Sequence, residues 1–316
     1  MRFQRAALAA GSLSGAVAAA LTTADAPAFD WLSIEPTREL RYSDCYDGFQ
    51  CARLRVPMDW NDPENNKTVD IAIATLPAKV PKSHRDYGGT VITNPGGPGG
   101  PGVSFVQRFG RHLQRVLDGN KKYDILSFDP RGVQYTTPRA DCFGDSFARD
   151  AWGLEDRGVG SLDASDDALK RHLALYGALG SLCEDTLRDS EILRHVSTAA
   201  VSRDMVEIVD RLDELKKKEL SAFSYTESQA QDPLVHHKGK TSEVARLQYI
   251  GFSYGTVLGN TFASMFPGRV GRVVIDGVED VVDYMSGVSK SVPNTSEIWQ
   301  PSDDCFKELD HKLGRY

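Results

Sequence analysis

The sequence lacks both a surplus of positive charge and long apolar segments. Its 37 lysines and arginines are outnumbered by 44 aspartates and glutamates, which gives a net charge of -7. A nucleic-acid partner requires a basic surface, so none is predicted. After the N-terminal segment, no stretch is apolar over the roughly 20 residues that a membrane-spanning helix needs. An internal repeat is also missing, which excludes a solenoid or propeller. The sequence therefore predicts a globular protein without stable membrane association.

Only the N-terminal segment is apolar over some length. Arg2 and Arg5 precede an uncharged run over 6–21, and small residues at 24–26 follow at the spacing that a signal peptidase requires. We therefore expect residues 1–26 to be a secretory signal peptide and the protein to be extracellular. A membrane anchor is the weaker alternative, because the run is short and rich in alanine, glycine and serine.

Cysteine is scarce, and the number of cysteines is odd. Secretion permits disulfides, and the spacing favours a small loop closed by Cys45 and Cys51. Cys142 and Cys183 flank one polar segment and are the second candidate pair. Cys305 is then left over, which indicates a free thiol or a partner that the chain does not contain.

Two asparagines stand in the N-x-S/T pattern of glycosylation acceptors. They are Asn66 and Asn294. Such acceptors lie in surface loops of secreted proteins, so both agree with the compartment that the signal peptide predicts.

Short strands alternate with helices along the chain. Apolar and β-branched runs predict strands at 53–56, 69–76, 90–93, 123–128, 245–250 and 270–275, and helical periodicity predicts helices at 104–117, 197–215 and 253–265. This alternation predicts an α/β fold, with a mostly parallel sheet covered by helices on both faces.

Two polar segments interrupt this pattern. We expect an irregular excursion with short helices at 142–183 and an exposed loop insertion at 221–242. The core domain is expected to run from 27 to 285. Residues 286–316 then form a tail or the start of a cap.

The strongest motif is the G-x-S-x-G sequence of residues 251–255, GFSYG. It stands between a predicted strand and a predicted helix, the context of a nucleophile elbow. Such a sharp turn raises the serine Oγ above the sheet, and the flanking glycines avoid collisions with the neighbouring strand and helix. We therefore predict Ser253 as the nucleophile and the N–H of Tyr254 as one donor to an oxyanion. The alternative is a purely structural role, in which Ser253 only caps the N-terminus of a helix.

A second motif, NPGGPGGPG at 94–102, directly follows a predicted strand. In the elbow fold this loop supplies the other oxyanion donor, which we assign to Gly97, with Gly96 as second choice. Gly97, Gly99 and Gly102 also match the dinucleotide pattern G-x-G-x-x-G, with an aspartate after the next strand. That reading is disfavoured because two prolines within the loop remove N–H groups that a pyrophosphate needs.

With these motifs, and with FDPRG at 128–132 and FPGRVGRVVIDGV at 266–278, the chain resembles secreted tripeptidyl-aminopeptidase-like and prolyl-aminopeptidase-like serine peptidases of the α/β-hydrolase fold. The resemblance runs from about residue 42 to 283. It implies acyl-enzyme chemistry, with release of short peptides or single residues from peptide N-termini, although some members are esterases. The implied partner is a small peptide or ester substrate, and no metal or organic cofactor is implied. It leaves the oligomeric state open.

The triad acid and base are not evident. In this fold they follow the serine in chain order, but His311 is the only later histidine and reads as a surface residue of a terminal helix. His195, His236 and His237 precede the serine and break that order, and Asp276 stands where members do not usually place the acid. We therefore expect the C-terminal part of the fold to be missing. The alternatives to a peptidase are a secreted esterase or lipase and a catalytically dead fragment or pseudoenzyme.

Overall fold

The computed structural model describes residues 29–228 and 244–286. The expected signal peptide, the acceptor Asn294, Cys305 and the histidines His236, His237 and His311 lie outside the described residues. The acceptor Asn66 is exposed in the turn before the third strand.

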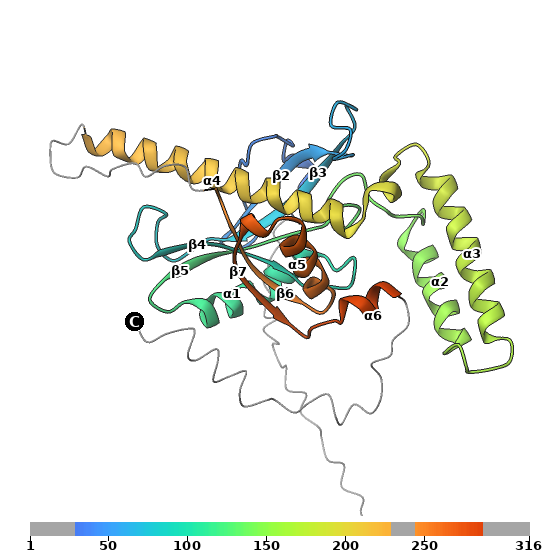
Figure 1. Ribbon diagram of the computed structural model, residues 1–316. Helices are drawn as coiled ribbons and strands as arrows, with labels where there is room; N and C mark the ends of the chain where they lie inside the picture. The colour runs from blue at the N-terminus through green and yellow to red at the C-terminus, as the bar shows by residue number, and fades with distance from the viewer. Residues whose placement is uncertain (1–28, 229–243, 287–316) are drawn as a thin grey trace, which may run out of the picture.

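A seven-stranded sheet forms the centre of the molecule (Figure 1). Its strands are β1 (Ser43–Cys45), β2 (Phe49–Pro57), β3 (Thr68–Leu76), β4 (Tyr87–Asn94), β5 (Lys122–Phe128), β6 (Leu247–Phe252) and β7 (Val270–Asp276). They lie in the order β1-β2-β3-β5-β4-β6-β7. The pairs from β1 to β5 are antiparallel, whereas β5, β4, β6 and β7 run parallel.

Helices cover both faces of this sheet, as expected. They are α1 (Gly102–Leu117), α2 (Ser146–Val159), α3 (Ala168–Leu187), α4 (Thr198–Ser228), α5 (Tyr254–Met265) and the short α6 (Val281–Ser286), with 3-10 turns at Trp31–Ser33, Ile192–His195 and Pro267–Arg269. Helix α1 packs on β3, β4 and β5, while α5 packs on β6, β7 and α4. Among the described residues, no helix combines the length and the apolar character needed to cross a membrane.

The alternation of side chains along β3 separates two hydrophobic cores. Ile71 and Ile73 belong to the core beneath α4 and α5, whereas Ala72 and Ala74 face the core beneath α1. This period of two is what an extended strand imposes. The small alanines let α1 approach the sheet closely, and the chain thereby places the start of α1 beside the ends of β4 and β5.

Two expectations need correction. The segment 142–183 is not an irregular excursion, since it holds most of the two long helices α2 and α3, which project from the body as a hairpin (Figure 1). Likewise, the expected loop insertion begins later than predicted, because α4 continues to Ser228. Residues 216–220, KKKEL, favour helix by intrinsic propensity, and α4 continues from them into the serine-rich stretch 221–228.

Both candidate cysteine pairs form disulfides. Cys45 is bonded to Cys51 across the β1–β2 turn, and Cys142 is bonded to Cys183. The second bond joins the segment before α2 to the C-terminal part of α3, so it closes the base of the projecting hairpin. Two disulfides are consistent with a secreted protein.

Candidate active site

Ser253 occupies a sharp turn between β6 and α5. Its backbone has φ 52° and ψ -127°, a region that non-glycine residues rarely adopt. The side chain is exposed, and the backbone N–H donates to the carbonyl oxygen of Asp276 on β7 at 3.0 Å. The turn thus presents the hydroxyl above the ends of two parallel strands, where ligands bind in open α/β sheets.

The flanking glycines permit this turn. A Cβ on Gly251 would stand 2.4 Å from the carbonyl oxygen of Gly255, and a Cβ on Gly255 would stand 2.7 Å from the carbonyl oxygen of Asn94. Real Cβ atoms do not approach a backbone oxygen so closely. Both glycines of the motif are therefore required by the packing of β6 against α5 and β4.

Side chains that the sequence did not single out support the turn. Thr256 Oγ1 donates to the carbonyl oxygen of Ser253 at 2.7 Å, and Tyr249 Oη donates to that of Gly255 at 2.8 Å. Tyr249 is buried, which raises the pKa of its phenol and keeps it a donor. These contacts hold the backbone on both sides of the serine.

The glycine-proline loop lies directly against the elbow. A Cβ on Gly96 would stand 2.4 Å from the carbonyl oxygen of Phe252 and 2.9 Å from the backbone nitrogen of Tyr254. The N–H of Gly96 is taken by the Asn94 side chain at 2.9 Å. Among the described residues the N–H of Gly97 donates no hydrogen bond. The structure therefore brings Gly96 and Tyr254 together and leaves the Gly97 N–H free to donate.

Asp129 binds the first turn of α1, and its contacts argue against the dinucleotide-binding hypothesis. Its carboxylate is fully buried and accepts from the backbone N–H groups of Val103 at 2.9 Å and Tyr135 at 3.1 Å. Burial raises the pKa of this carboxyl to about 6, partly offset by those N–H donors. A carboxylate committed in this way cannot receive the hydroxyls of a ribose.

Arg131 ties the loop after β5 to the opposite layer. Its guanidinium makes two hydrogen bonds to Asp204 on α4, at 2.5 and 2.7 Å, and both side chains are fully buried. It also donates to the carbonyl oxygens of Pro57 and Met58. Trp60 Nε1 completes the set with a bond to Asp204 at 2.9 Å. Three separate segments, the stretch 57–60, the loop after β5 and α4, are thereby joined.

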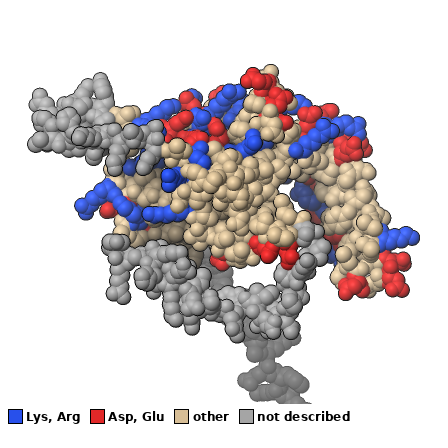
Figure 2. Space-filling model, in the orientation of Figure 1, with Lys and Arg blue, Asp and Glu red and all other residues tan. Residues whose placement is uncertain are grey.

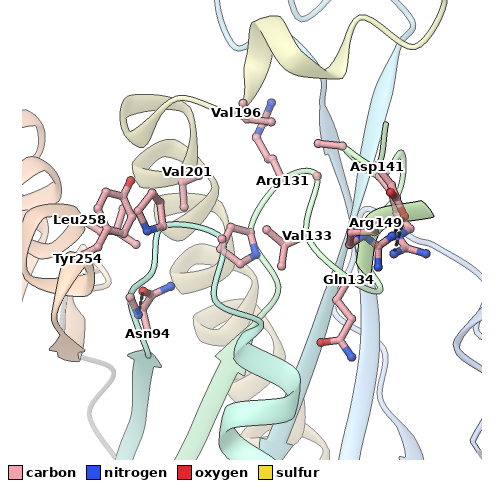
Figure 3. Close-up of a pocket in the computed structure, with 17 residues that line it drawn as sticks. Asn94, Arg131, Val133, Gln134, Asp141, Arg149, Val196, Val201, Tyr254 and Leu258 are labelled. Carbon is pink, nitrogen blue, oxygen red and sulfur yellow. Dashed lines mark hydrogen bonds and ion pairs between the residues drawn. The ribbon is translucent and has the colours of Figure 1, made fainter. Parts of the chain in front are cut away.

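A pocket of about 520 Å³ opens beside the elbow. Tyr254 and Leu258 line one end, and Asp141 and Arg149 line the other (Figure 3). Gly96 also lines it, whereas Ser253 and Gly97 stand at its side without lining it. The volume is within the range of small-molecule and peptide sites, about 300–1,000 Å³.

Within the described ranges, Ser253 Oγ makes no hydrogen bond to a histidine, and no three or more His, Cys, Asp or Glu side chains are placed to hold a metal. His195 lies in the 3-10 turn before α4. The described residues thus place an exposed serine beside backbone N–H groups, without a histidine hydrogen-bonded to its hydroxyl.

In the strand order, β2, β5, β4, β6 and β7 run in one direction, and β3 lies antiparallel between β2 and β5. This order, with a sharp serine-bearing turn after β6, is that of the α/β-hydrolase fold. No protein-family model matches the chain. A solved structure, juvenile hormone epoxide hydrolase from the silkworm Bombyx mori, aligns with a TM-score of 0.32 and 13% identity, covering 67% of this chain and 36% of that one.

Curated relatives are more informative. The chain is 30% identical to a tripeptidyl aminopeptidase of Streptomyces lividans, over 77% of this chain and 38% of that protein. It is 26% identical to serine protease Hip1 of Mycobacterium tuberculosis, over 74% and 36%. Carboxylesterase B of the same species is 29% identical over 57% and 32%. The chain spans less than two-fifths of the length of these relatives. The similarities support a hydrolase of the α/β-hydrolase type.

Proposed function

We propose that this chain carries the nucleophile side of a serine hydrolase that acts on peptides. Ser253 is the nucleophile and attacks the substrate carbonyl. The N–H groups of Tyr254 and Gly97 hold the oxyanion, with Gly96 as the neighbouring candidate. One observation carries the proposal: the exposed serine has the strained backbone of a nucleophile elbow, directly against a glycine loop with a free donor.

The chemistry is acyl transfer. The serine hydroxyl adds to the carbonyl, its proton passes to a base, and the leaving amine departs as the acyl-enzyme forms; water then releases the acid. A helix N-terminus behind the serine favours the developing negative charge. The base and its carboxylate are not among the described residues, so the proposal concerns the nucleophile and oxyanion site.

Peptides are the proposed substrates because two of the similar proteins are named as an aminopeptidase and a serine protease. We expect release of short peptides or residues from peptide N-termini. An esterase is the second candidate, favoured by the similarity to carboxylesterase B. Parallel assays of aminoacyl arylamides and short-chain esters separate the two, since ester-only turnover would refute the peptidase assignment.

The site itself is tested with a fluorophosphonate probe, which reports an activated serine. We expect the protein to be labelled at Ser253, with labelling lost in Ser253→Ala and kept in Ser264→Ala. Ser264 is a suitable control because it is an exposed serine on the same helix, α5. Absence of labelling in the folded parent protein would support an inactive fragment or pseudoenzyme instead.

A further inference from the structure

The end of the pocket farther from Tyr254 carries Asp141 and Arg149 (Figure 3). Arg139 lines the same pocket and pairs with Asp141, so the three side chains form a charged cluster. Both arginines contact the same carboxylate oxygen, Asp141 Oδ2, Arg139 at 3.1 Å. The other oxygen accepts from the N–H of Phe143 at 3.3 Å. A guanidinium has five N–H donors, so each arginine keeps donors that Asp141 does not use.

This end of the pocket has a positive surplus. Of the four charged side chains that line the pocket, Arg131 is neutralised by the buried Asp204. Two arginines then face a single carboxylate. Asp150 lies next to Arg149 on α2 and interacts with it electrostatically, but it does not line the pocket. The arginine side chains are 51% and 45% exposed, so their remaining donors are accessible.

The cluster is held in place by the backbone rather than by the long side chains alone. Arg139 forms a bridge with Gly132 in the loop after β5, and Ala140 N–H donates to the carbonyl oxygen of Gly132 at 2.9 Å. Asp141 precedes Cys142, whose disulfide to Cys183 closes the base of the α2–α3 hairpin. The hairpin thereby fixes where Arg149 meets the pocket, which lowers the ordering cost of binding.

Between the elbow and this cluster, Val133, Val196 and Val201 contribute apolar side chains to the pocket wall. We infer that the Arg139–Arg149 pair is a subsite for a substrate carboxylate, several bonds away from the carbonyl that Ser253 attacks. The inference rests on the proposed function for the placement of that carbonyl. It narrows the substrate class to peptides or esters that carry an acidic group, because planar guanidinium groups pair well with carboxylates.

Binding to the Ser253→Ala variant tests the subsite without catalysis. The probes are the peptide amides Glu-Ala-Ala-NH2 and Gln-Ala-Ala-NH2, which keep the free N-terminus of the proposed substrates and differ by one carboxylate. We expect the glutamyl peptide to bind about tenfold more tightly by calorimetry, a ratio typical of charge-assisted hydrogen bonds. Salt should weaken that preference. Equal affinities, or no binding of either peptide, would overturn the inference.

Substitutions of the two arginines and of Asp141 should change the preference for the acidic peptide in opposite directions. Arg139→Gln with Arg149→Gln should abolish the preference for the glutamyl peptide, and Asp141→Asn should strengthen it by freeing both guanidinium groups. Arg188→Gln is the matched control, because Arg188 is an exposed arginine at the C-terminal end of α3 that pairs with Asp185 and does not line the pocket. The subsite would be refuted if Arg188→Gln lost the preference for the acidic peptide as fully as the double variant does. It would also be refuted if Asp141→Asn weakened that preference.

The outcome is independent of the nucleophile test. Failure of the fluorophosphonate probe to label Ser253 would remove the serine hydrolase proposal while the peptide preference of Ser253→Ala still reports on the pocket. Conversely, labelling of Ser253 together with equal binding of the two peptides would leave the hydrolase proposal standing and overturn the carboxylate subsite.

Discussion

Gly96 of the glycine-proline loop and Tyr254 of the elbow are in direct backbone contact: a Cβ on Gly96 would stand 2.9 Å from the Tyr254 nitrogen. The same atom would stand 2.4 Å from the carbonyl oxygen of Phe252. Two motifs about 150 residues apart in the sequence therefore meet at one point. The contact leaves no room for a side chain at the place where an oxyanion would be held.

Gly96→Ala should therefore disrupt the oxyanion site. Loop and elbow must separate to admit the methyl group, and Gly96 also has φ +93°, which alanine rarely adopts. We expect fluorophosphonate labelling to slow by about 100-fold, the usual cost of a lost oxyanion donor. The measurement is the rate of fluorophosphonate labelling of the variant and the parent protein, with circular dichroism to check that both are folded.

Gly99→Ala is the control within the same loop. Gly99 has φ +85° but no atom within 4 Å of its Cβ position, so the variant carries backbone strain without a collision. We expect a stability loss of about 1 kcal/mol and only a small change in labelling. Equal effects of the two substitutions would show that strain, and not the contact with the elbow, explains the loss.

The buried ion pair of Arg131 and Asp204 should stabilise the fold strongly relative to a variant that lacks one of the two charged groups. Asp204→Ala leaves a buried guanidinium without its carboxylate, which typically costs about 3–5 kcal/mol. We expect that loss in the free energy of unfolding, measured by urea denaturation. The double variant Arg131→Met/Asp204→Leu should recover much of it, because two apolar side chains need no charge partner.

The exposed pair of Arg188 and Asp185 provides the comparison. Its side chains are 66% and 74% exposed, and such pairs contribute about 0–1 kcal/mol. Asp185→Ala should therefore leave the unfolding midpoint nearly unchanged. If Asp204→Ala were as mild as Asp185→Ala, the three-segment junction around Arg131 would not be important for stability.

Local motifs made much of the site predictable. The elbow is defined by five consecutive residues, and the steric need for glycine at 251 and 255 follows from the turn itself. The cysteine pairs were candidates by spacing. The strand positions could be read because β-branched runs alternate with glycine-rich turns. In each case the information lies within a few neighbouring residues.

Contacts between distant segments could not be read in this way. Arg131 and Asp204 are 73 residues apart, and no local pattern identifies the partner of Arg131. The length of helices α2 and α3 was not predicted, because many of their apolar side chains are exposed, among them Phe147 at 81% and Leu173 at 67%. A hairpin that packs little on the body lacks the clear apolar stripe from which helices are predicted.

The stability of the protein should depend on pH through Asp129. Its pKa is raised from 3.8 to about 6 by burial. An acid with a raised pKa in the folded state stabilises the fold fully below its unfolded pKa and loses that contribution as pH rises toward the folded value. Between about pH 4 and 6 this amounts to about 3 kcal/mol, since one pKa unit is about 1.4 kcal/mol.

Asp129→Asn removes this titration. We expect the stability of the parent protein, relative to the variant, to fall as pH rises from 4 to 7, measured by urea unfolding at each pH. Asp62→Asn is the control, because it also removes a carboxyl group but from an exposed position that leaves the buried site of Asp129 intact. Parallel pH profiles of the parent and Asp129→Asn proteins would show that the buried carboxyl does not carry the effect.

The last strand, β7, should make the described domain prone to self-association. It ends the sheet, and in the described part of the chain only β6 pairs with it. Val274 on β7 is an apolar residue that is 52% exposed. The centre of the molecule, in the view of Figure 2, is largely free of charged side chains. An unpaired apolar edge is a template for pairing with another chain. We expect concentration-dependent association in analytical ultracentrifugation.

Val274→Lys should reduce this association, because a lysine on an edge strand opposes the approach of a second strand. Fluorophosphonate labelling should be unchanged, since Val274 does not line the pocket. Val116→Lys is the matched control: Val116 is 68% exposed on α1, away from the sheet edge. If Val116→Lys reduced association as much as Val274→Lys, added charge alone would explain the result. A parent protein that stays monomeric at high concentration would contradict the role of the β7 edge altogether.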